Sequence, residues 1–117
     1  MSFPRRGEVY LVSFDPTVGH EIQKTRPAVI IQNDVSNRHS PITIVAAISS
    51  QFANPPHPRG VIIRSAKSGL SQASAAVLNQ IRSVDRKRLT KRLGSVDATT
   101  LAKIDDALKI SLGLVTL

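Results

Sequence analysis

The apolar residues of this chain come in short runs separated by turn-forming residues, and a helical period appears only near its end. Five runs rich in β-branched residues have the length of strands: 7–13, 27–32, 42–49, 60–64 and 75–78. From Leu101 to Leu112 apolar residues recur every three or four positions, with Asp97 as a candidate cap and Gly113 as a terminator. Because strands and helices do not alternate, the pattern excludes a doubly wound sheet. It predicts a mainly β (α+β) fold, a strongly bent sheet or barrel with helices at its C-terminal end.

The segments between these runs complete the expected outline. Residues 33–41 are rich in Asn, Ser and Pro and are expected to form a turn between two paired strands. Residues 15–26 and 51–58 have loop composition, with Pro and Gly as breakers. Beyond Asp85 a short helix over 85–92 is expected to carry a basic strip.

Size and composition limit the class of protein. The chain has 117 residues, 41% of them hydrophobic, and no cysteine, so we expect a single domain over 1–117 without disulfides or thiolate metal sites. The longest apolar stretches, 27–31 and 42–48, are too short to span a bilayer, and no export signal is visible. These features predict a soluble, cytoplasmic protein without membrane association.

Basic residues exceed acidic ones, and most of the excess is local. The net charge is +8, and residues 82–92 alone hold six basic side chains and one acidic one. Such a strip is either a phosphate-binding surface or a solvated face, and the charge of the whole chain favours a polyanionic partner. Charge alone does not distinguish RNA, DNA and an acidic protein.

The residue types that usually perform metal or nucleotide chemistry are scarce. The six glycines form neither a dinucleotide fingerprint nor a phosphate-binding loop, and His20, His39 and His57 lack metal-ligand spacing. Hydrolysis of DNA normally uses metal-activated water, whereas RNA carries its own nucleophile, the 2′-OH, and needs only an acid, a base and cations at the phosphate. If the chain cleaves nucleic acid, its composition favours metal-free cleavage of RNA.

Four blocks of sequence, in order and with similar spacing, resemble a known family. They are the opening at 6–34, which contains Gly19-His-Glu21 and Thr25-Arg-Pro27, and later blocks at 44–50, 78–89 and 106–114. Together they are similar to the MazF/PemK family of bacterial toxin endoribonucleases over about residues 5–114. Four blocks in register make a specific signal, whereas any one of them would be a modest one.

The resemblance implies a fold, an activity and partners. The fold would be an SH3-like barrel of the CcdB/PemK type with C-terminal helices, and the protein would be a homodimer. The activity would be sequence-selective cleavage of single-stranded mRNA to a 2′,3′-cyclic phosphate and a 5′-hydroxyl, with no metal or organic cofactor. The partner would be the cognate antitoxin of a type II toxin–antitoxin system, whose acidic segment blocks the RNA site.

Three catalytic residues follow from the resemblance. Arg26 stands in the family's Thr-Arg-Pro motif, where a guanidinium can hold two phosphate oxygens and stabilise charge on the phosphorane. Ser49 takes the place of a threonine in the MazF branch and keeps the hydroxyl donor without the methyl group. His20 matches a histidine of the PemK branch and can assist at the phosphate near neutral pH.

The remaining candidates are RNA-binding residues. We expect Asn79 and Gln80 to read base edges through amide hydrogen bonds, and Arg82 and Arg86 to hold the RNA backbone. Glu21 either contacts the substrate or pairs with Lys24 and orders its loop. The complete set is Glu21, Lys24, Asn33, Asn37, Ser50, Asn79, Gln80, Arg82 and Arg86.

Two positions depart from the family's pattern. The PemK branch has an ionisable acid and base where this chain has Val77 and Asn79. Neither side chain can take a proton from a 2′-OH, so that branch's mechanism does not transfer. Two alternatives therefore stay open. One is a non-catalytic toxin of the same fold that acts on a protein such as gyrase, and the other is a catalytically weakened dimer that binds RNA or antitoxin.

Overall fold

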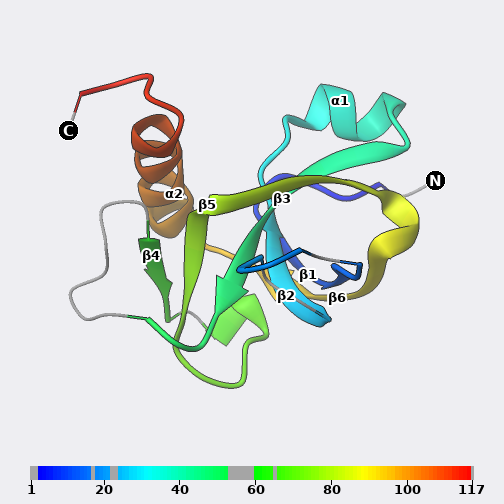
Figure 1. Cartoon of the computed structure of the whole chain (residues 1–117), viewed down its shortest axis with the longest axis horizontal. Helices are drawn as coiled ribbons and strands as arrows, with labels where there is room; N and C mark the ends of the chain where they lie inside the picture. Colours follow the sequence, from blue (N-terminus) through cyan, green and yellow to red (C-terminus); the bar gives the residue numbers. More distant parts are fainter. Residues whose placement is uncertain (1–2, 17, 22–23, 53–59, 65, 117) are drawn as a thin grey trace.

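The computed structural model describes residues 3–16, 18–21, 24–52, 60–64 and 66–116. Its elements in chain order are β1 (Glu8–Ser13), β2 (Thr25–Ile30), α1 (Asp34–His39), β3 (Ile42–Ser49), β4 (Gly60–Ile63), the 3₁₀ turn η1 (Ala66–Ser68), β5 (Ser74–Asp85), the 3₁₀ turn η2 (Arg86–Arg88), β6 (Leu89–Ser95) and α2 (Ala98–Ser111). The strands form one antiparallel sheet in the order β4-β5-β3-β2-β1-β6, and α2 packs beside β4 and β5 (Figure 1). The prediction of a mainly β fold with a C-terminal helix is confirmed.

The five predicted strands are present, and the structure adds a sixth. After β5 the chain turns through η2 and returns as β6, so the helix expected over 85–92 is wrong. β6 pairs with β1 at the edge of the sheet, with Arg92 opposite Tyr10 and Lys91 opposite Leu11. Charged side chains suit an edge strand because they oppose pairing with another chain, and here they interrupt the apolar pattern by which a strand is recognised.

The predicted turn at 33–41 contains a helix, α1. The Asn33 side chain caps it by accepting a hydrogen bond from the Ser36 N–H at 2.8 Å. The predicted pairing of the strands on either side is confirmed, since β2 and β3 are antiparallel neighbours. Of the loop predicted at 51–58, Gln51 and Phe52 are described; the rest, with His57, lies outside the described residues.

Strand β2 is buried on both faces. Ala28 and Ile30 belong to one hydrophobic cluster, and Val29 between them belongs to a second. The second cluster also contains Ile104 and Ala107, which attach α2 to the sheet. Because both faces are covered, the strand has a continuous apolar sequence in place of an alternating one.

The sheet bends until its two edges approach each other. Residues 77–80 of β5 oppose Ala47 alone in β3, an irregularity that bends the strand. Beyond β4, η1 reaches β6 at the opposite edge of the sheet. There a Cβ on Gly94 would lie 2.0 Å from the carbonyl oxygen of Lys67, so only glycine permits this contact.

The terminal helix follows the sequence prediction. The Asp97 carboxylate accepts a hydrogen bond from the Thr100 N–H at 2.8 Å at its start, and Gly113, at a φ of 72°, follows its end. Among the described residues, no helix is long and apolar enough to cross a membrane.

The helix cap predicts part of the acid sensitivity of the fold. Hydrogen bonds from the Thr100 side chain and N–H lower the pKa of Asp97 below its usual 3.8. A lowered pKa contributes stability that is present above the unfolded-state pKa and is lost as the pH falls through the folded-state value. In urea unfolding from about pH 5 to about pH 2, we expect Asp97→Asn to lose less stability than the wild type, because asparagine caps without titrating.

Asp97→Ala is the matched control for the cap. It removes the acceptor at every pH and should lower the free energy of unfolding already at neutral pH, where Asp97→Asn should not. Identical acid profiles for the wild type and Asp97→Asn would contradict the assignment.

Candidate active site

The three predicted catalytic residues line one open hollow of about 410 Å³. Its walls are formed by His20, Glu21, Lys24, Arg26, Ser49, Ser50 and Gln51. The first three residues come from the loop between β1 and β2, Arg26 comes from the start of β2, and the others lie at the end of β3. The structure thus brings together residues that are up to 31 positions apart in the sequence.

The antiparallel pairing of β2 and β3 explains why Arg26 and Ser49 meet. Ala28 lies opposite Ala47, and the same register continued by two residues sets Arg26 opposite Ser49. Since alternate residues of a strand point to the same face, both side chains share a face with the Ala28–Ala47 pair. The burial of that pair fixes the register, because a slip of one residue would expose the core.

The Ser49 hydroxyl is engaged with the backbone of Gln51. Its oxygen accepts from the Gln51 N–H at 3.1 Å and lies 3.2 Å from the Gln51 carbonyl oxygen, to which it donates. The hydroxyl therefore holds the chain in a turn immediately after β3. It can donate to a phosphate only by giving up the bond to the Gln51 carbonyl.

In the loop between β1 and β2, the His20 side chain is exposed to solvent, whereas the Glu21 side chain bonds to the backbone of the same loop. The Glu21 carboxylate accepts a hydrogen bond from the Val18 N–H, so this residue orders its own loop. Lys24 has a φ of 63°, and its N–H donates to the Asp15 carboxylate at 2.9 Å. His20 is exposed at the mouth of the hollow.

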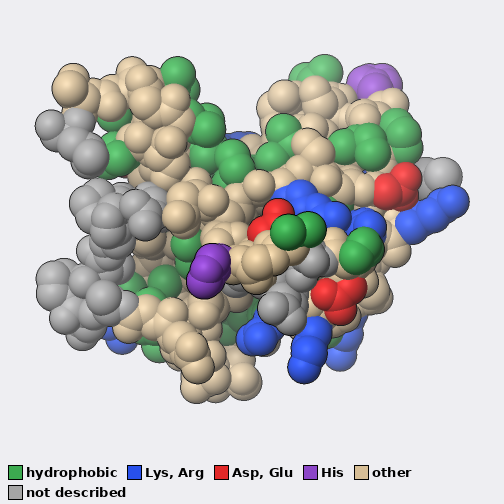
Figure 2. Space-filling view, viewed as in Figure 1, with side chains coloured by type: hydrophobic (Ala, Val, Ile, Leu, Met, Phe, Trp, Pro, Cys, Tyr) green, Lys and Arg blue, Asp and Glu red, His purple; other side chains and the backbone are tan. Residues whose placement is uncertain are grey.

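The hollow has a positive balance that suits a phosphate. Lys24 and Arg26 supply two cations, against the single carboxylate of Glu21. Figure 2 shows lysine and arginine side chains gathered over the part of the face occupied by β1, β2 and β6. In the part of the chain that the structure describes, no three His, Asp or Glu side chains are grouped so as to hold a metal ion.

Two predicted RNA-binding residues lie beneath the loop. Gln80 and Arg82, on β5, line a narrow space of about 70 Å³ together with Phe14, Glu21 and Ala47, among others. The Gln80 amide approaches the His20 carbonyl oxygen at 3.5 Å, and Arg82 donates to the Phe14 carbonyl at 2.6 Å. The exposed Asn79 precedes them on the same strand.

Asn37 does not meet the expectation of RNA contact, because it is fully buried. Its amide group donates to the Gln32 carbonyl at 2.8 Å, and its carbonyl accepts from the Thr43 hydroxyl at 2.7 Å. A buried amide with these partners fixes α1 on the sheet and leaves no group for a nucleotide. Its expected role as an RNA ligand is therefore wrong.

Asn33 and Arg86 lie outside the hollow. Asn33 caps α1, and the Arg86 N–H donates to the Pro41 carbonyl, next to the start of β3. The hollow is at the other end of β3, roughly 20 Å away for a strand of this length. Their contact with RNA stays a prediction that would need a substrate running along the sheet.

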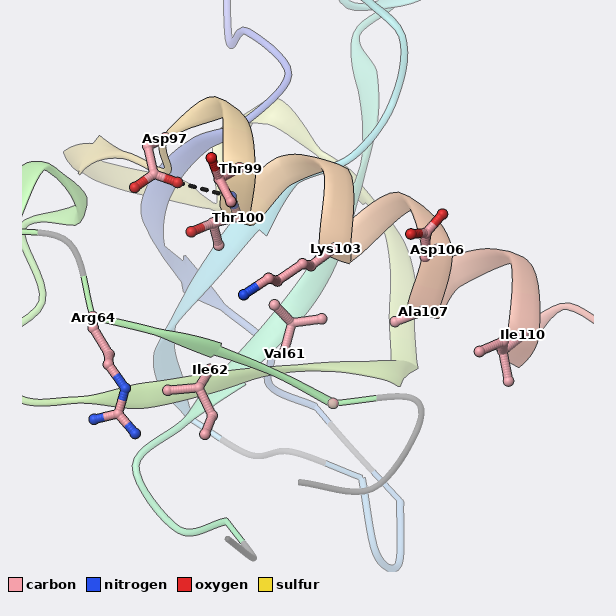
Figure 3. A pocket seen from close by; sticks show the side chains of 11 residues that line it. Val61, Ile62, Arg64, Asp97, Thr99, Thr100, Lys103, Asp106, Ala107 and Ile110 are labelled. Carbon is pink, nitrogen blue, oxygen red and sulfur yellow. Dashed lines mark hydrogen bonds between the residues drawn. The ribbon is translucent and has the colours of Figure 1, made fainter. Parts of the chain in front are cut away.

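A larger hollow of about 660 Å³ lies along β4 and α2 (Figure 3). Val61 points toward the helix, Ile62 points to the other side of β4, and none of the predicted site residues lines the hollow. The exposed apolar residues Leu112, Leu114 and Val115 follow directly after the helix. The lining of this hollow is mixed, because Arg64, Asp97, Lys103 and Asp106 stand beside its apolar side chains, and its charges balance.

Sequence reasoning missed two features of the site. Gln51 lines the hollow, and its position directly after Ser49-Ser50 was the available signal. The contacts of Arg82 and Arg88 with the loop backbone had no signal, because a basic run looks the same whether it faces solvent or its own chain.

Comparison with known proteins agrees with this fold. The sequence profile described as "PemK-like, MazF-like toxin of type II toxin-antitoxin system" matches residues 5–112. The chain belongs to this family.

A curated relative, Endoribonuclease EndoA of Bacillus subtilis (strain 168), is 41% identical over 111 residues, which are 95% of this chain and 96% of the relative. The fold is similar to MazF of Deinococcus radiodurans, with a TM-score of 0.82, 24% identity and coverage of 97% and 99% of the two chains. It is also similar to a mycobacterial endoribonuclease solved in complex with its cognate antitoxin, with a TM-score of 0.80, 23% identity and the same coverage.

Two of the three asparagines predicted to bind RNA, Asn37 and Asn79, should differ in their effect on stability. We expect Asn37→Ala to lower the free energy of unfolding by about 2 to 4 kcal/mol, because it leaves the Thr43 hydroxyl and the Gln32 carbonyl unpaired inside the protein. The exposed Asn79→Ala should change it by less than about 0.5 kcal/mol. Urea unfolding measures both, and equal effects would contradict the structural role given to Asn37.

Proposed function

We propose that this chain is a toxin that cleaves single-stranded mRNA in the cytoplasm as a sequence-selective endoribonuclease. The observation that carries the proposal is the meeting of Arg26, Ser49 and His20 in one open cationic hollow. A relative of 41% identity over nearly the whole chain, named an endoribonuclease, supports it.

The 2′-OH of the RNA is the nucleophile in the proposed reaction. Its oxygen attacks the adjacent phosphorus, the bond from phosphorus to the 5′-oxygen breaks, and a 2′,3′-cyclic phosphate and a 5′-hydroxyl result. One proton leaves the 2′-OH and one reaches the departing oxygen. Because the nucleophile belongs to the substrate, this reaction needs neither a metal-activated water nor an organic cofactor.

Each residue of the hollow has a proposed part in this reaction. The Arg26 guanidinium holds the non-bridging oxygens and stabilises the charge of the phosphorane. The Ser49 hydroxyl donates to the phosphate after releasing the Gln51 carbonyl. His20, which also lines the hollow, supplies a side chain that can exchange a proton with the reacting oxygens. Val77 and Asn79 have no proton to exchange, so the acid–base role falls to the loop.

Lys24 and Arg26, the cations of the hollow, would also attract an acidic inhibitor. An acidic segment of a cognate antitoxin would place carboxylates against Lys24 and Arg26, where the phosphates of RNA otherwise lie. A mycobacterial relative has been solved in complex with its cognate antitoxin. We therefore propose that the antitoxin competes with RNA for this hollow.

Arg26→Ala tests the proposed activity. With a long RNA in excess EDTA, we expect the wild type to produce discrete cuts ending in cyclic phosphates, and Arg26→Ala to cleave about 100-fold to 1,000-fold more slowly. Arg38→Ala, which removes an exposed arginine from α1, is the matched control and should cleave like the wild type.

Three outcomes of the cleavage assay are decisive. If the wild type makes no cuts, the proposed activity is contradicted. Cuts that persist at full rate in Arg26→Ala would remove this hollow from the reaction. Cleavage of a matched DNA, or cleavage only after metal is added, would contradict attack by the 2′-OH.

We also propose a homodimer that forms through the face between β4 and α2. The hollow there has Val61, Ile62, Ala107 and Ile110 in its mixed lining, and the exposed side chains of Leu112, Leu114 and Val115 follow directly after α2. Apolar side chains gathered in this way are typical of an interface between subunits.

A charge on this face should dissociate the dimer. Leu114 is 70% exposed and Val35, on α1, is 74% exposed, so neither side chain supports the core of the chain itself. In sedimentation equilibrium we expect Leu114→Asp to reduce the mass from two chains to one, because it buries a carboxylate at the interface. Val35→Asp should remain a dimer. Equal masses for the two variants would exclude this interface.

A further inference from the structure

We propose that Arg82 and Arg88 are positioning residues that hold the described part of the loop between β1 and β2 (14–16, 18–21 and 24) against the sheet and so set where His20 and Glu21 lie. This inference rests on the proposed function for its catalytic consequence but not for its structural part. It assigns two of the six basic residues at 82–92 to a clamp on the chain's own backbone, where the sequence suggested a surface that binds phosphate.

Arg82 contacts the loop from the sheet. It lies on β5 and is half-buried, and its Nη1 donates to the carbonyl of Phe14 at 2.6 Å. Phe14 is 3% exposed and its side chain belongs to a core cluster. The residue is therefore held by the packing of its side chain and by the hydrogen bond of Arg82 to its carbonyl. The donor is charged, and hydrogen bonds from charged donors are the stronger class.

Arg88 holds the neighbouring residues. From η2, its Nη1 donates to the carbonyl of Ser13 at 3.0 Å and to that of Asp15 at 2.6 Å. Together the two arginines bond three successive carbonyls where the chain leaves β1. The two arginines approach from different elements, so the start of the loop is fixed in direction as well as in place.

The end of the loop is tied to this same start. The Phe14 N–H donates to the Lys24 carbonyl at 2.9 Å, and the Lys24 N–H donates to the Asp15 carboxylate at 2.9 Å. A displacement of residues 13–15 therefore also moves Lys24, which lines the hollow. In contrast, the contact of Gln80 with the His20 carbonyl is long, at 3.5 Å, and holds the loop weakly.

A residue that positions the loop and a residue that binds RNA phosphate should affect the kinetics of RNA cleavage differently. A basic residue that binds phosphate changes the affinity for RNA, and its loss is offset by lower salt. A residue that positions the loop changes the rate at saturating RNA, because His20 is then misplaced in the bound complex. The separation of kcat from KM, measured at two salt concentrations, distinguishes the two roles.

The first experiment needs no RNA. In amide hydrogen exchange on the full-length protein, we expect Arg88→Gln to speed exchange of the Phe14 and Lys24 amides by about tenfold, while the amides of β3 keep the wild-type rate. Lys91→Gln is the matched control, since it removes an exposed charge from β6 in the same strip. It should leave the Phe14 and Lys24 amides unchanged.

The second experiment uses single-stranded RNA. We expect Arg88→Gln to lower kcat by about tenfold at both salt concentrations, and Lys91→Gln to affect only KM, with recovery at low salt. Arg82→Gln, which breaks the contact with Phe14 alone, repeats both measurements if Arg88→Gln does not fold.

The outcomes separate this inference from the proposed function. Unchanged exchange at Phe14 and Lys24, or equally faster exchange in β3, would overturn the clamp, since it requires an effect confined to the loop. Faster loop exchange in a protein that cleaves no RNA would support the clamp while the proposed activity fails. A variant with faster loop exchange and wild-type kcat would overturn the positioning role.

Discussion

The antiparallel contact between β2 and β3 is the constraint on which the rest of the molecule depends. Both strands lie in the middle of the sheet, and β2 is buried on both faces, so neither strand can slide without exposing part of the core. The same register, extended two residues beyond the last pair, Ala28–Ala47, brings Arg26 to the end of β3 that carries Ser49. Hydrophobic packing of the two strands thus contributes to placing a cation near a hydroxyl.

The β1–β2 loop adds what the sheet alone does not supply. The strands carry Arg26 and Ser49 to the hollow, whereas His20 comes from the loop. A loop of this length tolerates many conformations unless its ends are held. Its backbone contacts with Arg82 and Arg88 link two residues of the basic strip to a loop that lines the hollow.

Much of the fold could be predicted from the sequence because local and global signals agree in it. The apolar runs mark the central strands, and Asp97 and Gly113 mark the ends of α2. β6 could not be predicted, because pairing with β1 makes it a strand although most of its outward residues are charged or polar. In the site, Arg26 and Ser49 followed from motifs. The burial of Asn37 did not, because Asn33 and Asn37 occupy equally polar surroundings in the sequence and differ only in tertiary packing.

The left-handed conformation of Lys24 shows that folding is not the only demand on this position. Such a conformation costs a residue with a Cβ about 1 to 2 kcal/mol relative to the right-handed one, a cost that glycine would not incur. The chain nevertheless carries a lysine there, at the wall of the cationic hollow. Glycine at position 24 would relieve this backbone cost and remove one of the two cations that line the hollow. At position 24, backbone stability and the charge of the hollow thus depend on the same side chain.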